Sequence, residues 1–516
     1  MATLRGISPL AFLAPPRQVS VDEASAAVAR VCPAAEVLPA AAPGELRWRV
    51  PDLALAGVLR TLATDLEARL FTHVAHGARL VVTLAPDPGP LLTLEAEGAL
   101  PALLPVLPAA GWCDREARDL GLALAGVDPR PLLRPSGLSA LPVQPGLARF
   151  SHGPIHDGID GSAVIHFNND GELMRGVEPE LFHDHRGVER LAEGRSPDDV
   201  LALAERLCSA CAVAHALSLC SASERAAGAD VEASVPPRAR ALRTLLAEVE
   251  RMLGHTRDLG VILAGLGVHQ GGAQLALLEH ELREVAALLT GSRMLFGALR
   301  VGGVTRDLPA GGRDLARRLR RVGRKLGLLW DRVGETPAAV DRADGLGTVP
   351  RARALDLGLV GVAARACRIP RDARKDRPYA HYGEVDFKLS LSDRGDVVGR
   401  SRVRIDELRE AVAIACQCID GLPEGPLAVE VPAPAPGAVA HGWAESARGE
   451  TVTWVAFGSD GRLARWRVRS ASYFNWAALP AALADAADTS SAVGALASDL
   501  PLVRRSLGLC TACVDR

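Results

Sequence analysis

The residues of this chain best suited to chemistry are two Cys-x-x-Cys pairs. The first pair is Cys208 with Cys211, followed four residues later by His215, and the second is Cys510 with Cys513. Thiolate and imidazole groups are ligands for soft or borderline metals. The pattern therefore predicts a metal site built from four thiolates, with an imidazole close by.

Other uses of paired cysteines fit this sequence less well. A zinc ribbon usually has about 15–20 residues between its pairs, whereas 298 residues separate Cys211 from Cys510. A dithiol redox motif needs one pair and leaves the other unexplained. Single cysteines often only fill an apolar core, but that does not account for two spaced pairs. A metal site requires the whole chain to fold so that the pairs meet.

The residues before the first pair indicate a helix. Ser196 and Pro197, followed by two aspartates, form a typical helix start, with a capping hydroxyl, a proline in the first turn and acids at the positive end. A helix that continued from there would place Cys208, Cys211 and His215 on one face. We therefore expect a single helix to present these three side chains.

The composition restricts the class of protein. The 59 Lys and Arg nearly balance the 61 Asp and Glu, which argues against nucleic acid as a partner. Ten cysteines in 516 residues are too few for a disulfide framework. The N-terminus is a poor signal peptide, and the apolar stretch 259–278 contains His269, Gln270 and glycines, so we expect two buried helices there. These features predict a cytoplasmic protein with free thiols.

The pattern along the chain predicts an α+β fold in two domains. Residues 1–145 are expected to form a small α/β domain, with a helix over 59–70, a strand over 78–84, short strands within 86–108, a charged helix over 111–121 and a linker over 128–145. Residues 146–516 are expected to form a mostly helical domain with peripheral β-hairpins, at 162–172 and 451–471. Its helices are predicted within 181–334, with the longest runs over 237–264, 273–289 and 314–333.

Several stretches match a known family, namely Gly153–His156, His185–Glu189, Arg206–His215, Glu445–Glu450 and Leu500–Arg516. With them the chain resembles the large subunit of membrane-bound, energy-converting nickel–iron hydrogenases of the formate hydrogenlyase and hydrogenase-4 type. That subunit is homologous to the 49-kDa subunit of respiratory complex I. The helix Trp112–Leu120, followed by Asp128-Pro-Arg, resembles the 30-kDa subunit of complex I, so residues 1–145 correspond to a fused 30-kDa-like domain and 146–516 to the 49-kDa-like large subunit.

The resemblance assigns roles to individual residues. Cys208 and Cys510 would be terminal nickel ligands, and Cys211 and Cys513 would bridge nickel and iron. His215 would orient a bridging sulfur by a hydrogen bond. The iron would also carry carbon monoxide and cyanide, and a 4Fe-4S cluster is expected in a partner subunit. The remaining cysteines are expected to be packing residues: Cys32, Cys113, Cys220, Cys367, Cys416 and Cys418.

Three further features follow from the same family pattern. Arg448 matches an arginine held over the open metal position, whereas an ion pair with Glu445 or Glu450 is the alternative. Asp160 stands where the family usually has a proton-transferring glutamate, and capping a turn is its alternative role. Ala447 replaces a proline beside Arg448 and should loosen that loop. The charged run 371–377 and Arg365 are expected either in an ordered ion-pair network or in a solvated loop.

The resemblance implies an enzyme that oxidises H2 or reduces protons and passes electrons to a small iron–sulfur subunit. Membrane subunits of a complex-I-like assembly would be further partners, at the cytoplasmic face of the inner membrane. The alternative is a coupling subunit of a complex-I-like oxidoreductase without hydrogenase activity, and a structural zinc scaffold is a third reading. The four cysteines favour the enzyme. We also expect the three residues after Cys513 to be buried beside the metals.

Overall fold

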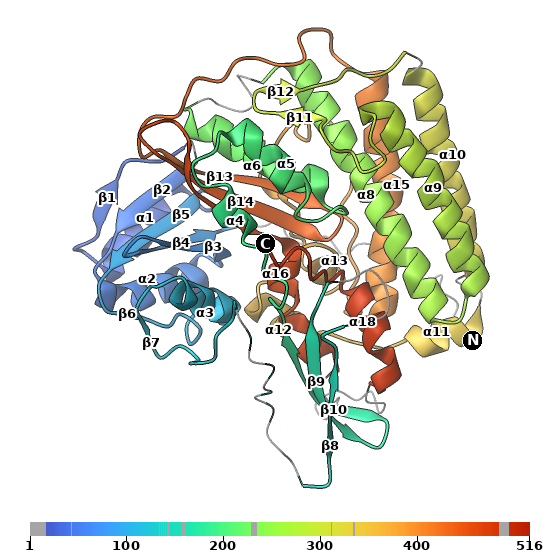
Figure 1. Cartoon of the computed structure of the whole chain (residues 1–516), viewed down its shortest axis with the longest axis horizontal. Helices are drawn as coiled ribbons and strands as arrows, with labels where there is room; N and C mark the ends of the chain where they lie inside the picture. The colour runs from blue at the N-terminus through green and yellow to red at the C-terminus, as the bar shows by residue number, and fades with distance from the viewer. Residues whose placement is uncertain are drawn as a thin grey trace.

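The computed structural model (Figure 1) describes residues 17–42, 44–133, 135, 137, 139, 141, 145–155, 161–228, 235–310, 312–333, 336–483 and 495–516. The chain contains both helices and strands, and the strands form several small sheets, so the predicted α+β class is confirmed. None of the helices in the described ranges combines the length and the apolar character that crossing a bilayer requires.

A five-stranded sheet dominates the N-terminal part of the chain, shown in blue in Figure 1. Its strands lie in the order β1-β2-β5-β4-β3, and only β2 and β5 run parallel. The run Leu80–Ala85 is buried throughout, as expected for a strand covered on both faces. The elements of this part are α1 (Val21–Val31), β1 (Glu36–Leu38), β2 (Glu45–Arg49), α2 (Asp52–Asp65), β3 (Arg69–His76), β4 (Arg79–Ala85), β5 (Leu91–Glu97), β6 (Leu100–Pro101), η1 (Pro108–Ala110), α3 (Gly111–Asp119) and β7 (Leu124–Ala125).

The acidic residues of the charged helix α3 bind different segments of the protein. Asp114 accepts hydrogen bonds from the backbone N–H groups of Leu103 and Leu104, at 2.7 and 2.9 Å. Asp119 accepts from the N–H of Leu133 at 2.9 Å, which fixes the chain beyond the helix. Glu116 points elsewhere, into the second half of the protein. The acidic pattern that predicted this helix therefore reflects contacts with three different segments.

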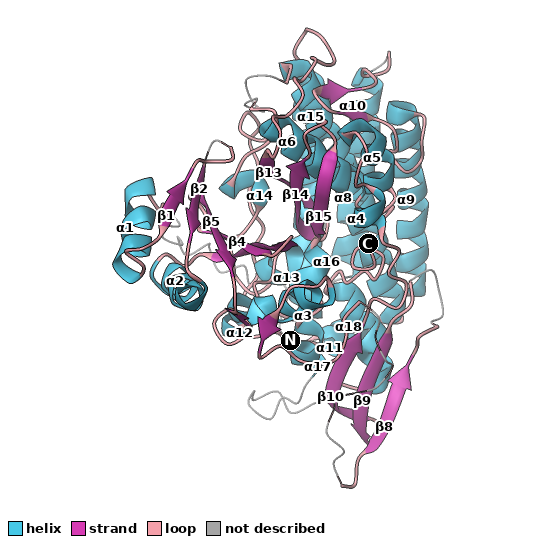
Figure 2. Ribbon diagram, turned by 60° about the vertical axis from the view of Figure 1, so that its left-hand side comes forward, coloured by secondary structure: helices cyan, strands magenta, loops and turns pink. Residues whose placement is uncertain are grey.

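The second half begins with an antiparallel sheet that projects from the molecule in Figures 1 and 2. The predicted hairpin at 162–172 is present as β9 (Val164–Asp170) and β10 (Leu173–Glu180). The strand β8 (Ala148–His152) pairs with β9 and makes it a three-stranded sheet. The exposed strand β8 forms its outer edge.

Four long helices form the bundle that lies to the right in Figure 1, namely α8 (Pro237–Gly265), α9 (His269–Thr290), α10 (Gly312–Val333) and α15 (Val397–Asp420). The expected break within 259–278 is present between α8 and α9. Two glycines let these helices approach closely, because a Cβ on Gly272 would lie 2.9 Å from the carbonyl oxygen of Gly260. The predicted helix, break and second helix are therefore confirmed, but the prediction that both helices are buried is wrong, because Val261 and Leu277 are 43% and 68% exposed.

The sheet β13-β14-β15 lies between this helical part and the N-terminal sheet (Figure 2). Its strands are β13 (Val439–Ser446), β14 (Gly449–Phe457) and β15 (Leu463–Arg469), so the hairpin predicted at 451–471 gains a third strand. The shorter elements of the second half are α4 (Val188–Leu191), α5 (Pro197–Glu205), α6 (Ala212–Ala226), β11 (Leu299–Arg300), β12 (Gly303–Val304), α11 (Pro337–Ala343), α12 (Arg351–Asp356), α13 (Gly361–Arg365), α14 (Ala373–Asp376), α16 (Ala471–Asn475), α17 (Ala478–Leu483), η3 (Ala497–Asp499) and α18 (Leu500–Ser506).

The apolar core is continuous between the two halves. Trp112 of α3 makes edge contacts with Phe182 and Tyr473, whose ring centroids both lie 6.0 Å from its own. Buried residues of the N-terminal sheet and of α16–α18 belong to one hydrophobic cluster. The buried residues therefore do not divide into separate clusters at the predicted domain boundary. Both halves are needed to bury these aromatic rings, because Trp112 of the N-terminal part packs against Phe182 and Tyr473 of the second half.

Candidate metal centre

The first cysteine pair lies in a turn between two helices. As predicted, Ser196 caps α5, and its hydroxyl accepts a hydrogen bond from the N–H of Asp199. The expectation of one continuous helix is wrong, because α5 ends at Glu205 and α6 begins at Ala212. The N–H of Cys211 donates to the carbonyl oxygen of Cys208 at 3.0 Å, and this turn brings both sulfurs to the same place.

Glu250 of α8 caps the helix that follows the first pair. The N-cap residue of α6 is Cys211 itself, which provides no side-chain cap. Instead, Oε2 of Glu250 accepts hydrogen bonds from the N–H groups of Val213 and Ala214, at 2.5 and 3.3 Å. Burial raises the pKa of Glu250 to about 8, although these two hydrogen bonds favour its charged form. A carboxyl group thus fixes the start of the helix directly after a candidate ligand.

The second pair lies in the segment that follows α18. The hydroxyl of Ser470 donates to the carbonyl oxygen of Cys513 at 2.9 Å, and Trp476 donates to that of Cys510 at 3.3 Å. Both partners follow β15 in the chain, so the sheet that precedes them also positions this pair. The three residues after Cys513 are buried, as the sequence predicted.

The structure brings the two pairs together. The sulfur atoms of Cys208, Cys211 and Cys513 lie within 4.8 Å of one another, and those of Cys208 and Cys510 are 3.7 Å apart. A separation of this size is what two thiolates show when each is roughly 2.3 Å from a shared metal ion. The other six cysteines are also free thiols, and all are buried.

Arg448 lies directly beside this cluster, at the turn between β13 and β14. Its Nη1 atom is 3.3 Å from the sulfur of Cys211 and 4.0 Å from that of Cys208. Burial disfavours its charge, but Cys211, Cys510 and Asp258 hold the pKa of Arg448 well above its usual value. The alternative ion pairs are not formed, because Glu445 binds Arg365 at 2.9 Å and Glu450 binds Arg69 at 2.7 Å.

The turn that carries Arg448 is held tightly although Ala447 stands in it. Arg251 donates to the carbonyl oxygens of Glu445 and Ser446, at 2.6 and 3.0 Å. A Cβ on Gly254 of α8 would lie 2.6 Å from the Cβ of Ala447. The expected loosening of this loop is therefore not seen, because packing against α8 and these hydrogen bonds restrain it.

His215 is buried in the first turn of α6, and neither of its ring nitrogens has a hydrogen-bond partner. Burial lowers the pKa of His215 to about 4, although the nearby Cys510 favours the cation. The ring is therefore neutral at pH 7 and has one N–H to donate. A buried donor without a partner indicates a missing acceptor, which a metal-bound thiolate would supply.

Asp160, the candidate proton-transferring carboxyl, lies outside the described residues. The residue after it, Gly161, is described and lies beside the second pair. A Cβ on Gly161 would be 3.0 Å from the hydroxyl oxygen of Thr511, which lies between Cys510 and Cys513. The chain next to Asp160 therefore reaches the cysteine cluster.

The charged segment near residue 371 forms a buried ion-pair network. Arg365 binds Glu407 at 2.6 Å, and Arg374 binds Asp372 at 2.7 Å. Arg365 also binds Glu445, three residues from Arg448. Of the two possibilities left by the sequence, the ordered network is the correct one.

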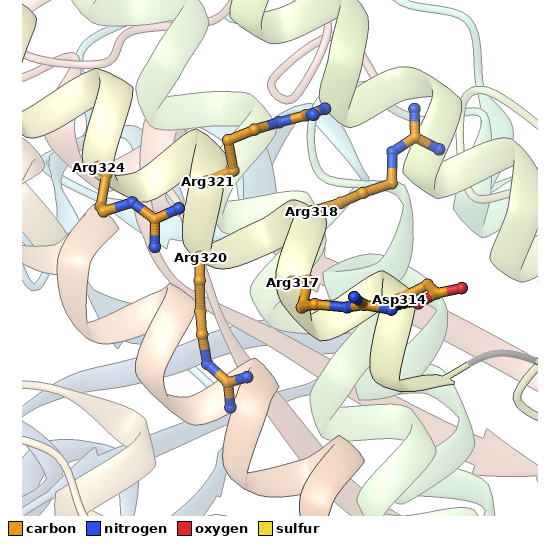
Figure 3. Close-up of a pocket in the computed structure, with 6 residues that line it drawn as sticks. All are labelled: Asp314, Arg317, Arg318, Arg320, Arg321 and Arg324. Atoms are coloured by element: carbon orange, nitrogen blue, oxygen red, sulfur yellow. Dashed lines mark hydrogen bonds and ion pairs between the residues drawn. The ribbon is translucent and has the colours of Figure 1, made fainter.

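The arginines of α10 are exposed, except for the partly buried Arg318, and form a separate surface (Figure 3). Arg318 binds Glu284 at 2.8 Å and Arg320 binds Asp420 at 2.6 Å. The hollow between these side chains is lined by Asp314, Arg317, Arg318, Arg320, Arg321 and Arg324. This hollow lies on the outer face of the bundle, and none of the cysteines of the cluster lines it.

Two residues that position the site were not singled out from the sequence. Glu250 carries no motif signal of its own, since it is one of several acids on a long helix. Arg186 stood within a matching stretch, yet only the structure shows that its guanidinium binds the loops of both cysteine pairs.

Comparison with known proteins places this geometry in a family. Residues 186–257 match the model of the nickel-dependent hydrogenases, and residues 279–441 match that of the 49-kDa subunit of respiratory-chain NADH dehydrogenase. Formate hydrogenlyase subunit 5 of Escherichia coli (strain K12) is 32% identical over 452 residues, which are 81% of this chain and 77% of that protein. A carbon monoxide-induced hydrogenase of Rhodospirillum rubrum is 30% identical over 368 residues, which are 70% of this chain and 98% of that protein.

A solved structure shares the fold. It comes from the membrane-bound sulfane sulfur reductase, an archaeal respiratory membrane complex, and is 27% identical with a TM-score of 0.65. The match covers 73% of this chain and 100% of that chain. Together with the four clustered cysteines, these similarities show that the chain belongs to the family of nickel-dependent hydrogenase large subunits of the formate hydrogenlyase and hydrogenase-4 type, which is related to the 49-kDa subunit of complex I.

Proposed function

We propose that this chain is the catalytic large subunit of a nickel–iron hydrogenase, which oxidises H2 to protons and electrons or catalyses the reverse reaction. The observation that carries the proposal is the meeting of four cysteine sulfurs from pairs 298 residues apart in the sequence. Their soft donor set suits nickel and iron. The unpartnered nitrogens of His215 suit a second layer of contacts around such a centre.

Each cysteine has a proposed place in the centre. Cys208 and Cys510 would hold nickel alone, and Cys211 and Cys513 would hold both nickel and iron, whose remaining ligands would be carbon monoxide and cyanide. When bound, this centre supplies the position at which the H–H bond is cleaved heterolytically and two electrons are taken up.

The side chains around the sulfurs manage the charge and the protons. Arg448 places a fixed cation 3.3 Å from the Cys211 sulfur, where it stabilises thiolate charge and polarises a molecule that approaches the metals. The thiolate of Cys208 or Cys510 would accept the first proton. Asp160 is the proposed next acceptor, supported by the contact of its neighbour Gly161 with Thr511.

Electrons leave through a separate iron–sulfur subunit. The single group of three or more clustered metal-binding side chains that was found in the described ranges is the one formed by Cys208, Cys211 and Cys513. A 4Fe-4S cluster needs four further thiolates, and we propose that a partner subunit provides them. Because a solved relative comes from a membrane-bound respiratory complex, we also propose membrane subunits as partners and attachment at the cytoplasmic face of the inner membrane.

The second candidate is a coupling subunit of a complex-I-like oxidoreductase, which the match of residues 279–441 favours. Infrared spectroscopy and metal analysis of the purified complex distinguish the two. The hydrogenase should contain nickel and show bands from bound carbon monoxide and cyanide. A complex without nickel and without these bands would contradict the hydrogenase function, and zinc at the four cysteines would indicate a structural site.

A further inference from the structure

A buried ionic cluster joins the N-terminal part of the chain to the segment of the second cysteine pair. We call it the Glu116 cluster, and its members are Glu116, Glu189, Arg467, Arg469, Tyr473 and Arg516. Glu116, on α3, is its centre. One oxygen of Glu116 accepts hydrogen bonds from Arg467 at 2.8 Å and from Arg516 at 2.6 Å. The other accepts from the hydroxyl of Tyr473 at 2.8 Å and lies 3.3 Å from Arg469.

Arg516 connects this cluster to a candidate ligand. It is three residues after Cys513, and its Nε atom donates to Glu189 at 2.6 Å. The residues between them form a compact turn, in which the N–H groups of Val514 and Asp515 both donate to the carbonyl oxygen of Thr511. Arg516 is therefore linked to Cys513 through a short turn whose backbone is held by hydrogen bonds.

The charge of Glu116 is needed to hold three arginines together. All members of the cluster are buried. Burial alone would raise the pKa of Glu116, but Arg469, Arg516 and Arg467 hold it well below its usual value. Without Glu116, the three guanidinium groups would face a single carboxylate, Glu189. Removing one partner from a buried ionic group is strongly destabilising, because the remaining charges lose their compensation.

We propose that Glu116 is a positioning residue for the metal centre, through which the N-terminal part of the chain holds the second cysteine pair in place. The proposal rests on the proposed function, since it concerns the same four thiolates. Glu116 touches no candidate ligand and acts through Arg516. The segment of the second cysteine pair then depends on a carboxylate that the N-terminal part supplies.

The test is Glu116→Gln, which keeps the size of the side chain and removes its charge. Hydrogen exchange followed by mass spectrometry should show exchange at least about ten-fold faster over residues 507–516. Exchange in α9, which is remote from the cluster, should remain as in the wild type. Nickel per protein should fall several-fold, and the infrared bands of the remaining loaded protein should shift. The matched control is Glu97→Gln, at the exposed end of β5, where Glu97 binds only Arg79 among the described residues.

The outcomes separate this proposal from the proposed function. Wild-type exchange over 507–516 together with wild-type nickel content would overturn the role of Glu116 and leave the hydrogenase untouched. If the wild type holds no nickel, the exchange measurement still decides whether Glu116 holds the segment. If Glu116→Gln exchanges faster everywhere, Tyr473→Phe decides, since it removes one hydrogen bond to Glu116. A smaller increase confined to 507–516 would support the proposal, and no increase would overturn it.

Discussion

Arg186 donates a hydrogen bond of 2.8 Å to the carbonyl oxygen of Ala512, which lies between the two cysteines of the second pair. The same nitrogen donates to the carbonyl oxygen of Leu207, next to Cys208, at 2.9 Å. Its Nε atom reaches the carbonyl oxygen of Asp515 at 2.7 Å. One planar guanidinium therefore joins loops that are about 300 residues apart in the sequence.

Arg186→Lys should weaken the site without removing a ligand. Lysine keeps the charge, but its one nitrogen cannot stand at the positions of both Nη2, which donates to Leu207 and Ala512, and Nε, which donates to Asp515. Each lost charged hydrogen bond is worth about 1.5–3 kcal/mol. We expect nickel content and activity to fall together, several-fold, when metal analysis is combined with a hydrogen-uptake assay. Arg190→Lys, on the exposed side of α4, is the control. Normal nickel content in Arg186→Lys would show that the two loops are held by other contacts.

Serine at each of the four cysteines should abolish hydrogen turnover and lower nickel content. A hydroxyl is a poor ligand for a site that selects soft thiolates. The variants are Cys208→Ser, Cys211→Ser, Cys510→Ser and Cys513→Ser, measured by metal analysis and turnover. Cys416→Ser, at a buried thiol of α15 that belongs to neither pair, is the control. Full activity in any one of the four variants would remove that residue from the ligand set.

The ionisation of Asp376 should make the stability of the protein depend on pH. Burial, with Asp87 nearby, raises the pKa of Asp376 to about 8, whereas an unfolded aspartate titrates near pH 4. Between these values the folded state binds more protons than the unfolded state, so this group makes the protein less stable as the pH rises. Asp376→Asn cannot ionise and keeps an acceptor for the N–H of Asp372, which lies 2.8 Å away.

Thermal melting at pH 5, 6, 7 and 8 tests this expectation. The melting temperature of Asp376→Asn relative to the wild type should increase with pH and exceed it by a few degrees at pH 8. Asp460→Asn, in an exposed turn, should follow the wild type at every pH. A constant difference between Asp376→Asn and the wild type would mean that Asp376 is charged throughout this range.

The sequence predicted local features of the fold well and long-range ones less well. The cap at Ser196, the break between α8 and α9 and the strand after Arg79 depend on neighbouring residues, and all three are present. The continuous helix through Cys208 was wrong, because the cap that starts α6 comes from Glu250, which is 37 residues further along the chain than Val213. The shared core of Trp112 and Tyr473 was missed for the same reason.

For the candidate site too, the sequence predicted the local pattern but not the contacts between distant segments. The residue types and spacing of the two pairs were enough to predict four clustered thiolates. The division of the chain at residue 145, the individual ligand roles and the role of Asp160 stay predictions. Arg186 and Glu116 could not be assigned from the sequence, because an arginine or a glutamate acquires its function here from backbone groups and charges that folding brings from elsewhere.

Arg448→Lys tests the chemistry of the site apart from its assembly. The guanidinium of Arg448 lies 3.3 Å from the sulfur of Cys211, and its backbone turn is fixed by Arg251 and by packing against α8. Lysine keeps a positive charge, but it is shorter at the tip, lacks the planar fork and releases its proton more readily. Losing a preorganised electrostatic partner typically costs about 10²–10³ in rate, and the retained charge should limit the loss to roughly ten- to a hundred-fold. Nickel content should stay near that of the wild type, because all four thiolates remain, and Arg409→Lys on the exposed face of α15 should behave as the wild type. If nickel is lost in parallel with turnover, Arg448 serves to assemble the centre and has no separate part in the reaction.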